Sequence, residues 1–219
     1  MLIGDGVSSY EAGEVWHLLD TRVHMPITKI PMRNFNKVSL DKYNTMVMVS
    51  GKYNLTEKQM SKIKDWTSKG NTLIIIGTAS KWAIEKKLVK EKLTKTEKDS
   101  SQIAVRKPYV DARENIGKES LGGVILNVDL DITHPLAYGY RDSNIPVYKN
   151  NSVWLTPSKN SYATIAKYTK NPHIDGFITE KNMQENILNS ASLIVSKLGS
   201  GRVVLFADNP NFRFMVWNQ

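Results

Sequence analysis

Residues 72–83, with the sequence TLIIIGTASKWA, bring two hydroxyl side chains to a place where they could do chemistry. Four aliphatic residues at 73–76 run into Gly77, and an amphipathic helical pattern begins directly after this glycine. A strand, a sharp turn and a helix in this order lift a nucleophilic side chain above a sheet in many hydrolytic enzymes. Thr78 and Ser80 are therefore the first residues to weigh as a nucleophile or as ligand-binding groups.

The residues that commonly bind metal ions are scattered along the chain. The four histidines form no HxxE, HExxH or HxH pair, and the chain has no cysteine. A catalytic zinc ion usually has three protein ligands, which further polar groups hold in place. We therefore expect no metal site and no cofactor in this chain.

A Gly-Asp-Gly turn at residues 4–6 forms one part of a dinucleotide-binding pattern, since it follows an expected strand and precedes an expected helix. The third glycine of that pattern is missing, because Ser9 stands at its position, and no GxxxxGK[ST] motif occurs. A tight turn before a helix N-terminus explains both glycines, although an anion could also bind there.

The composition is that of a globular protein with an excess of basic residues. The chain has 219 residues, 41% of them hydrophobic and 23% charged, and a formal net charge of +9. In the densest charged stretch, residues 81–99, lysines alternate with acidic residues, which favours a solvated helix face over a nucleic-acid surface. We therefore expect no nucleic-acid partner. A basic protein that binds nucleic acid is kept as a third hypothesis, behind the two that are described below. The longest aliphatic run is far shorter than the roughly 20 residues of a membrane helix, so no membrane span is expected.

Strand and helix patterns alternate through the first part of the chain. Helices are expected after Ser8 and Thr56, each followed three positions later by a residue that completes a capping box. The expected strands are continuous apolar runs, which predict a parallel sheet covered by helices on both faces. These strands lie at residues 1–4, 26–30, 44–51 and 71–77.

The second part of the chain is less regular. Residues 86–122 are expected to form an irregular, exposed insertion, and residues 122–131 and 145–169 show short strand patterns like those of an antiparallel meander. Thr179 is expected to cap a helix that ends at Gly199, before a last buried strand at 201–208. The apolar face of this helix would consist of Met183, Ile187, Ala191, Ile194 and Leu198. We expect one domain over residues 1–219, cut from a longer protein, because the chain opens as if in mid-strand.

The order of these elements resembles the class I glutamine amidotransferase-like fold. This resemblance implies an α/β, flavodoxin-like three-layer sandwich with a mostly parallel sheet and a small antiparallel excursion. Enzymes of this fold carry Gly-x-Cys-x-Gly at the turn and His-Pro-Glu after a late strand; the cysteine attacks an amide and the His–Glu pair activates it. Here Ala79 stands in the nucleophile slot, while Asn209 and Asn211 stand at the histidine and glutamate positions. The resemblance therefore implies a pseudoenzyme in which all three catalytic functions are lost.

A hydrolase that acts through Ser80 or another non-cysteine nucleophile is the alternative. A displaced serine could attack a substrate if a base lay within hydrogen-bond reach. Lys81 replaces the second glycine of the motif, however, and its side chain would crowd the close packing that such a turn needs. We therefore favour an ordinary turn with a capping hydroxyl.

Several segments more closely resemble the amidotransferase-like domain that follows the peptidase domain in Bacteroidetes zinc carboxypeptidase-like proteins. These segments are residues 4–20, 25–30, 129–140 and 199–213, of which THPLAYGY and DNPNFR are the most specific. In that family the zinc and the catalytic glutamate belong to the preceding peptidase domain, so zinc is expected only there. The resemblance implies a metallocarboxypeptidase-like parent whose peptidase domain is the partner of this one. It also implies a periplasmic, cell-surface or secreted location.

In open α/β sheets, ligands bind beyond the carboxyl ends of the strands. The loops expected there supply carboxylates, hydroxyls and one arginine, a mixture that could hold a small polar ligand or a peptide end, or could form a hydrogen-bonded loop cluster without a ligand. The sequence thus predicts a non-catalytic accessory domain that binds a ligand or packs against the peptidase domain. The possible ligand-binding residues are Asp5, Ser8, Glu11, Thr78, Ser80 and Arg213.

Overall fold

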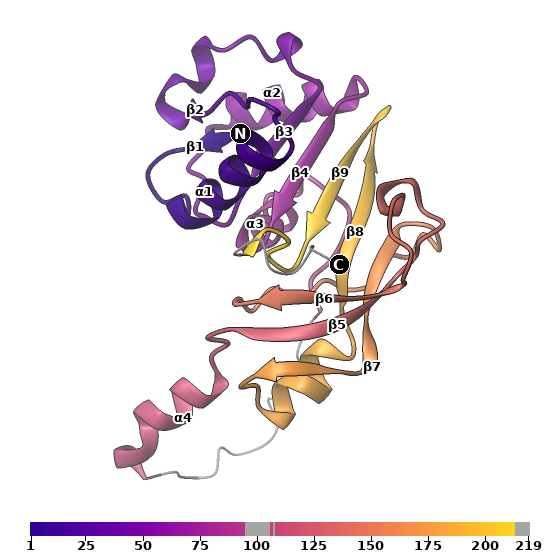
Figure 1. The fold of residues 1–219 in the computed structure, drawn as a ribbon. Coiled ribbons are helices and arrows are strands. Elements are labelled where there is room, and N and C mark those ends of the chain that lie inside the picture. The colour runs from indigo at the N-terminus through magenta and orange to yellow at the C-terminus, as the bar shows by residue number, and fades with distance from the viewer. Residues whose placement is uncertain (95–105, 107, 213–219) are drawn as a thin grey trace.

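The computed structural model describes residues 1–94, 106 and 108–212 (Figure 1). Its strands are β1 Leu2–Ile3, β2 Ile30–Pro31, β3 Thr45–Met48, β4 Thr72–Ile76, β5 Val124–Leu130, β6 Asn144–Lys149, β7 Thr164–Gly176, β8 Ala191–Leu198 and β9 Gly201–Phe206. Its α-helices are α1 Ser9–His17, α2 Glu57–Ser68, α3 Thr78–Glu85 and α4 Ala112–Glu119. Seven strands form one sheet in the order β3-β4-β9-β8-β7-β5-β6, and β1 and β2 pair separately. None of the helices in these described ranges is both long and apolar enough to cross a membrane.

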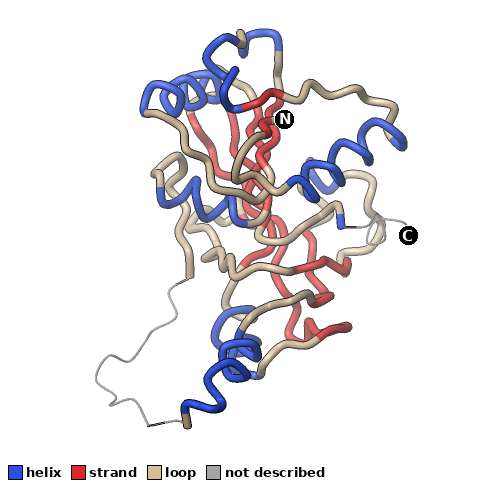
Figure 2. Tube along the Cα trace, turned by 90° about the vertical axis from the view of Figure 1, so that its left-hand side faces the viewer, coloured by secondary structure: helices blue, strands red, loops and turns tan. Residues whose placement is uncertain are grey.

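The parallel part of the sheet has the three layers that its apolar strands predict. β3, β4 and β9 run parallel, and neighbouring residues of β4 point to opposite faces. Leu73 and Ile75 pack with apolar residues of α2 and α3, whereas Ile74 and Ile76 contact the cluster that includes Val15 of α1. Figure 2 shows these strands between helices on either side.

The helix starts that the sequence predicts are confirmed. Thr56 Oγ1 accepts a hydrogen bond from the Gln59 main-chain N–H at 3.3 Å, and Gln59 Oε1 accepts the main-chain N–H of Thr56 at 2.8 Å, so α2 has a complete capping box. Ser8 Oγ accepts from the Glu11 N–H at 3.3 Å in the same way. The Glu11 carboxylate does not reach back to Ser8, however, because it is bonded to a neighbouring loop.

The expectation of a mostly parallel sheet with a small antiparallel excursion is wrong. Within the seven-stranded sheet of the described residues, β3–β4 and β4–β9 are parallel, and the other four pairings, from β9–β8 to β5–β6, are antiparallel. Burial alternates along β5 and β6, as is common in antiparallel strands that have one solvated face.

The long helix expected from Thr179 to Gly199 is also wrong. A π-helical turn at Asn182–Ile187 is followed by β8, which pairs with β7 on one side and β9 on the other. Ala191–Leu198 is rich in β-branched and aliphatic residues, and it forms a hairpin with β9 through Gly199 (φ +62°). In the region expected as an insertion, α4 is helical, and residues 95–105 and 107 lie outside the described part of the chain. That the chain is one domain stays a prediction.

The sheet curls until its edge strand returns to the end of β9. β6 lies well away from β9 in the sheet order, yet Asn209, just after β9, pairs with Tyr148 of β6. The Asn209 main-chain N–H donates to the Tyr148 carbonyl at 3.0 Å. The antiparallel strands therefore form a half-barrel whose inner face is mostly apolar.

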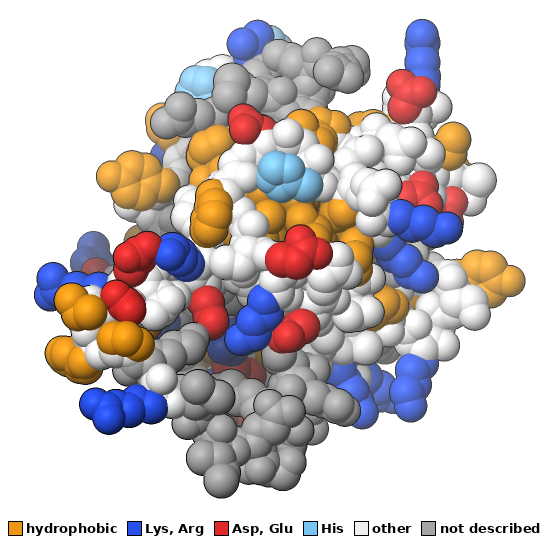
Figure 3. All heavy atoms as spheres, turned by 90° about the horizontal axis from the view of Figure 1, so that it is seen from below, with side chains coloured by type: hydrophobic (Ala, Val, Ile, Leu, Met, Phe, Trp, Pro, Cys, Tyr) orange, Lys and Arg blue, Asp and Glu red, His pale blue; other side chains and the backbone are white. Residues whose placement is uncertain are grey.

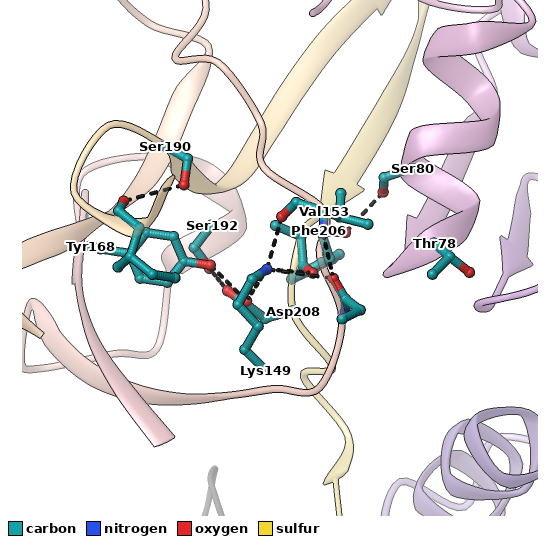
Figure 4. Close-up of polar contacts among 12 residues, drawn as sticks. Thr78, Ser80, Lys149, Val153, Tyr168, Ser190, Ser192, Phe206 and Asp208 are labelled. Atoms are coloured by element: carbon teal, nitrogen blue, oxygen red, sulfur yellow. Dashed lines mark hydrogen bonds and ion pairs between the residues drawn. The ribbon is translucent and has the colours of Figure 1, made fainter. Parts of the chain in front are cut away.

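A buried ion pair joins the two strands where this curl closes. The Lys149 ammonium lies 3.2 Å from Asp208 Oδ1, and both side chains are almost inaccessible to solvent (0% and 2% exposed). Lys149 Nζ also donates to the main-chain carbonyls of Val153 at 2.9 Å and Ala207 at 3.2 Å (Figure 4). Burial lowers the pKa of Lys149, and the Asp208 carboxylate opposes that shift.

Two neutral hydroxyls complete the cluster around Asp208. Tyr168 donates to Oδ1 at 2.7 Å and Ser192 donates to Oδ2 at 2.5 Å, from β7 and β8 respectively. Burial, together with the nearby carboxylate, raises the pKa of Tyr168 well above its usual value, so this phenol stays protonated and keeps donating. Three strands, β6, β7 and β8, and the loop after β9 thus supply one hydrogen-bonded cluster.

On the face seen from below in Figure 3, acidic and basic side chains lie next to one another. Exposed ion pairs in the described structure include Lys118–Glu114 at 2.5 Å and Lys181–Glu119 at 3.5 Å. Exposed pairs of this kind contribute little to stability, because water and salt screen them. They differ in this respect from the pair between Lys149 and Asp208.

The Asp208→Asn variant should lower the free energy of unfolding by about 3–5 kcal/mol, because it leaves the Lys149 charge buried without a counter-charge. Denaturant unfolding followed by circular dichroism measures this loss. Replacing both charges together, as in Lys149→Met with Asp208→Leu, should cost less than the single change. Glu114→Gln on the exposed α4 is the control and should leave the unfolding midpoint unchanged. Equal stability of wild type and Asp208→Asn would contradict the assignment.

Candidate functional site

The candidate site is a groove at the carboxyl ends of β1, β3 and β4, where ligands of open α/β sheets bind. Its volume is about 1290 Å³, and residues 6–10, residues 50–56, one side of α3 and the following Lys86 line it. Three of these are lysines, Lys52, Lys81 and Lys86, whereas the acidic side chain among them is Glu85, which pairs with Lys81 at 3.8 Å. The groove wall therefore has an excess of positive charge.

The turn between β4 and α3 has the backbone that its sequence predicts, but a different residue at its tip. Gly77 adopts φ 57° and ψ −128°, a strained region that side chains disfavour, and it precedes the first helical residue. In enzymes that use this turn, the nucleophile occupies the strained residue between strand and helix. The assignment of Ala79 to that slot is therefore corrected: the slot belongs to Gly77. Ala79 lies fully buried in the first turn of α3.

A serine hydroxyl from the loop after β3 fills the space above this glycine. Ser50 Oγ accepts the Thr78 main-chain N–H at 3.0 Å, and a Cβ placed on Gly77 would overlap the same Oγ. Thr78 Oγ1 in turn accepts the Gly51 N–H at 3.0 Å. The two loops are thus joined by reciprocal hydrogen bonds, and the N–H of Thr78 at the start of α3 is already occupied.

Ser80 faces away from the groove. Its side chain is inaccessible to solvent. Its Oγ lies within hydrogen-bond distance of two main-chain carbonyl oxygens, that of Phe206 at 2.8 Å and that of Ile75 at 3.2 Å (Figure 4). No imidazole or carboxylate is among its hydrogen-bond partners in the described structure. Its geometry is that of a hydroxyl that ties α3 to the sheet.

Glu11 is a buried carboxylate next to the groove. Its Oε2 accepts the Ser50 main-chain N–H at 2.9 Å, which links α1 to the loop after β3. Burial raises the pKa of Glu11 above its ordinary value of 4.5, the hydrogen bonds from Ser50 oppose this, and the charge of Glu14 adds to it. Glu11 therefore supports the position of Ser50.

The remaining residues singled out from the sequence lie apart from the turn. Asn209 Nδ2 donates to Glu14 Oε2 at 2.7 Å, and Asn209 Oδ1 accepts the Asn211 N–H at 3.0 Å, so both asparagines stabilise the loop after β9. Asp5 is exposed and is not among the groove-lining residues. Arg213 lies outside the described residues. The structure thus brings together Ser8, Glu11, Thr78 and Ser80 around the turn, but only Ser8 and Thr78 face the groove.

Sequence reasoning missed Ser50, Asn151 and the cluster around Asp208. Asn151 Nδ2 has no hydrogen-bond partner among the described residues and lies 3.5 Å from the position that a Gly77 Cβ would take. A signal for Lys149 was available, because strand alternation places it on the same face as Ile145 and Val147. In the described ranges, no group of three or more His, Asp or Glu residues could hold a metal ion.

Comparison with known proteins identifies the fold. No family model and no curated protein matches the sequence. PurLQS from Thermotoga maritima matches with a TM-score of 0.58, 12% identity, and coverage of 96% of this chain and 85% of that one. A protein described as ThuA-like from Parabacteroides merdae ATCC 43184 matches with a TM-score of 0.56 and 12% identity, over 94% and 77% of the two chains.

A protein from Thermoplasma acidophilum, described as part of a GMP synthase, has a TM-score of 0.53 and 10% identity, over 94% of this chain and 81% of its own. Likeness at such low identity establishes fold and leaves activity open. Together with the mixed, curled seven-stranded sheet, these neighbours show that the chain has a class I glutamine amidotransferase-like α/β fold.

Proposed function

We propose that this chain is a non-catalytic accessory domain with an amidotransferase-like fold, and that its parent is a zinc carboxypeptidase-related protein. The observation that carries the first part is the identity of the strained residue at the tip of the β4–α3 turn. Gly77 has no side chain, so the position that would present a nucleophile presents none. The turn has kept its backbone geometry without the group that would use it.

The neighbouring hydroxyls support the same proposal. Thr78 Oγ1 and Ser50 Oγ both accept main-chain N–H groups across the turn, and Ser80 Oγ is buried against carbonyls. A serine nucleophile needs a general base within hydrogen-bond reach and access to the substrate. The contacts of Ser80 supply neither, which weighs against the alternative of a hydrolase acting through Ser80.

The parent protein and its location are inferred from the sequence resemblance alone. Segments such as residues 129–140 and 199–213 resemble the domain that follows a zinc-dependent peptidase domain, and the proposal takes that peptidase domain as the partner within one polypeptide. A periplasmic, cell-surface or secreted location follows from the same resemblance. Zinc would then be bound by the peptidase domain.

The groove is the part of the domain that we propose binds a ligand. Lys52, Lys81 and Lys86 give its wall an excess of positive charge, and the hydroxyls of Ser8 and Ser9 lie at the same groove. These groups suit a small polar ligand that carries a carboxylate, such as a peptide end. Because the lysines are exposed, their attraction for such a ligand should weaken as salt is added.

The first test is turnover. The chain should release no product from glutamine, from p-nitrophenyl acetate or from a peptide above the rate in buffer. Ser80→Ala should leave that background unchanged and lower the free energy of unfolding by about 1–3 kcal/mol, because it removes a buried hydroxyl that bridges two elements. Turnover by the wild type that disappears in Ser80→Ala, but persists in Thr78→Val, would overturn the proposal.

The second test addresses the space above Gly77. Gly77→Ala should destabilise the chain, because an added Cβ meets Ser50 Oγ and because alanine disfavours this backbone region. The same substitution should cost measurably less in a Ser50→Ala background, where that oxygen is gone. Denaturant unfolding of the wild type, both single variants and the double variant gives this coupling directly. Strictly additive losses would show that Ser50 does not fill the nucleophile's space.

The third test uses the pKa of Glu11. Since this pKa is raised in the folded state, the folded chain binds more protons than the unfolded chain at pH values just above 4.5. The contribution of Glu11 to stability is therefore fully present below pH 4.5 and is lost as the pH rises through the folded pKa. Unfolding free energies of the wild type and of Glu11→Gln should be measured from pH 4 to 7. The free energy of the wild type should fall relative to that of Glu11→Gln as the pH rises. A difference independent of pH would contradict the burial of an ionisable Glu11.

A further inference from the structure

A second cavity lies inside the half-barrel, on the face of the sheet that carries α1. Its volume is about 430 Å³, within the range of small-molecule sites, and it shares no lining residue with the groove. Its wall combines one side of α1 and the following turn with inner residues of β4, β5, β6, β7, β8 and β9. It is therefore a separate feature from the site proposed above.

The burial of the lining residues shows which end of this cavity is deep. Leu136 and Tyr140 are 43% and 37% exposed, and the half-buried Leu19 lies with them at the rim. Ser192 and Asp208 are only 3% and 2% exposed, so they lie in its buried part, together with apolar residues such as Val128. The cavity thus has mostly apolar walls, with Ser192 and Asp208 as its polar bottom and the half-buried Asn211 as a further polar lining residue.

The polar bottom has hydrogen-bonding capacity left over. A carboxylate has about four acceptor positions, and the described donors to Asp208 are Tyr168, Ser192 and Lys149. Oδ2 receives one of them, from Ser192, whose own oxygen can still accept a hydrogen bond. A ligand group that reaches this end must therefore donate a hydrogen bond.

The charge of the ligand is restricted by the same cluster. Lys149 and Asp208 already balance each other at 3.2 Å, and both side chains are almost fully buried. A second buried charge would have to lose its hydration without a partner, which is strongly unfavourable. An anionic head group would, in addition, face the Asp208 carboxylate at close range. A neutral hydroxyl meets neither penalty.

We propose that this cavity is a binding site for a neutral amphiphile, a molecule with a slender apolar body and a terminal hydroxyl. The apolar body lies between α1 and the inner faces of the antiparallel strands, and the hydroxyl donates to Asp208 Oδ2 or Ser192 Oγ. Apolar walls supply affinity through burial of the ligand's surface, and the polar end fixes its direction. This site is independent of the proposed accessory function, because none of the residues of the turn at Gly77 takes part.

The test uses 1-octanol as the probe and octanoate as its charged counterpart, with the full chain. Methyl signals of Val128, Val147 and Leu193 should shift in a saturable way with 1-octanol, whereas those of Leu55 in the groove should not. Octanoate should bind at least about tenfold more weakly, in line with the cost of burying its charge. Ser192→Ala should weaken 1-octanol binding by about threefold to tenfold, as expected for one hydrogen bond.

Matched tryptophan variants locate the site. Leu19→Trp narrows the rim of the cavity and should abolish the saturable shifts, whereas Leu55→Trp, at a half-buried leucine of the groove, should leave them intact. Both positions are partly exposed, so both variants should fold, and circular dichroism checks that they do. Absence of saturable shifts in the wild type, equal binding of octanoate, or equal effects of the two tryptophans would each overturn the proposal.

Discussion

The Lys149 ammonium and the Asp208 carboxylate are 3.2 Å apart with almost no access to solvent, and the form of the antiparallel half of the sheet depends on their meeting. Each charge alone would be too costly to bury, so the ends of β6 and β9 must come together for either strand to take its place. The pairing of Tyr148 with Asn209 next to them fixes the same closure through the main chain. The curled sheet therefore satisfies both buried charges, which would lack each other as partners in an open sheet.

The backbone of the turn at Gly77 is held by contacts that do not depend on a reactive side chain. A strained backbone persists only where the surroundings determine it. Here those surroundings are the hydrogen bonds from Thr78 to Ser50 and from Gly51 to Thr78, together with Ser80, which bonds α3 to the sheet. All of these contacts stabilise the turn, and none of them requires a reactive side chain. These structural contacts are enough to maintain the turn.

The parallel half of the fold could be predicted from the sequence, because its strands are uniformly apolar and its helices begin with capping residues such as Thr56. The antiparallel half could not. In the segment after Thr179, the apolar residues from Met183 to Leu198 fit a helical repeat. Ala191–Leu198 forms a strand because it pairs with β7 on one side and β9 on the other. Local periodicity is ambiguous in such short apolar runs, and tertiary pairing resolves it. Of the residues singled out from the sequence, Ser8 and Thr78 line the groove, whereas Ser50 was missed because its contact with Thr78 joins residues 28 positions apart. The contact of Asp208 with Lys149, outside the groove, spans 59 positions. No spacing rule in one sequence encodes such contacts.

The mixed sheet also explains why the chain has an interior cavity. Parallel strands are joined by crossover helices, which cover both faces as a by-product of connectivity. Antiparallel strands such as β8 and β9 are joined by a hairpin that brings no helix, so their apolar inner residues must be buried by curvature. A curled sheet shields its inner face from solvent without filling the space that it encloses. The cavity lined by Ser192 and Asp208 is the space that remains between the curled sheet, α1 and the loop at Leu136.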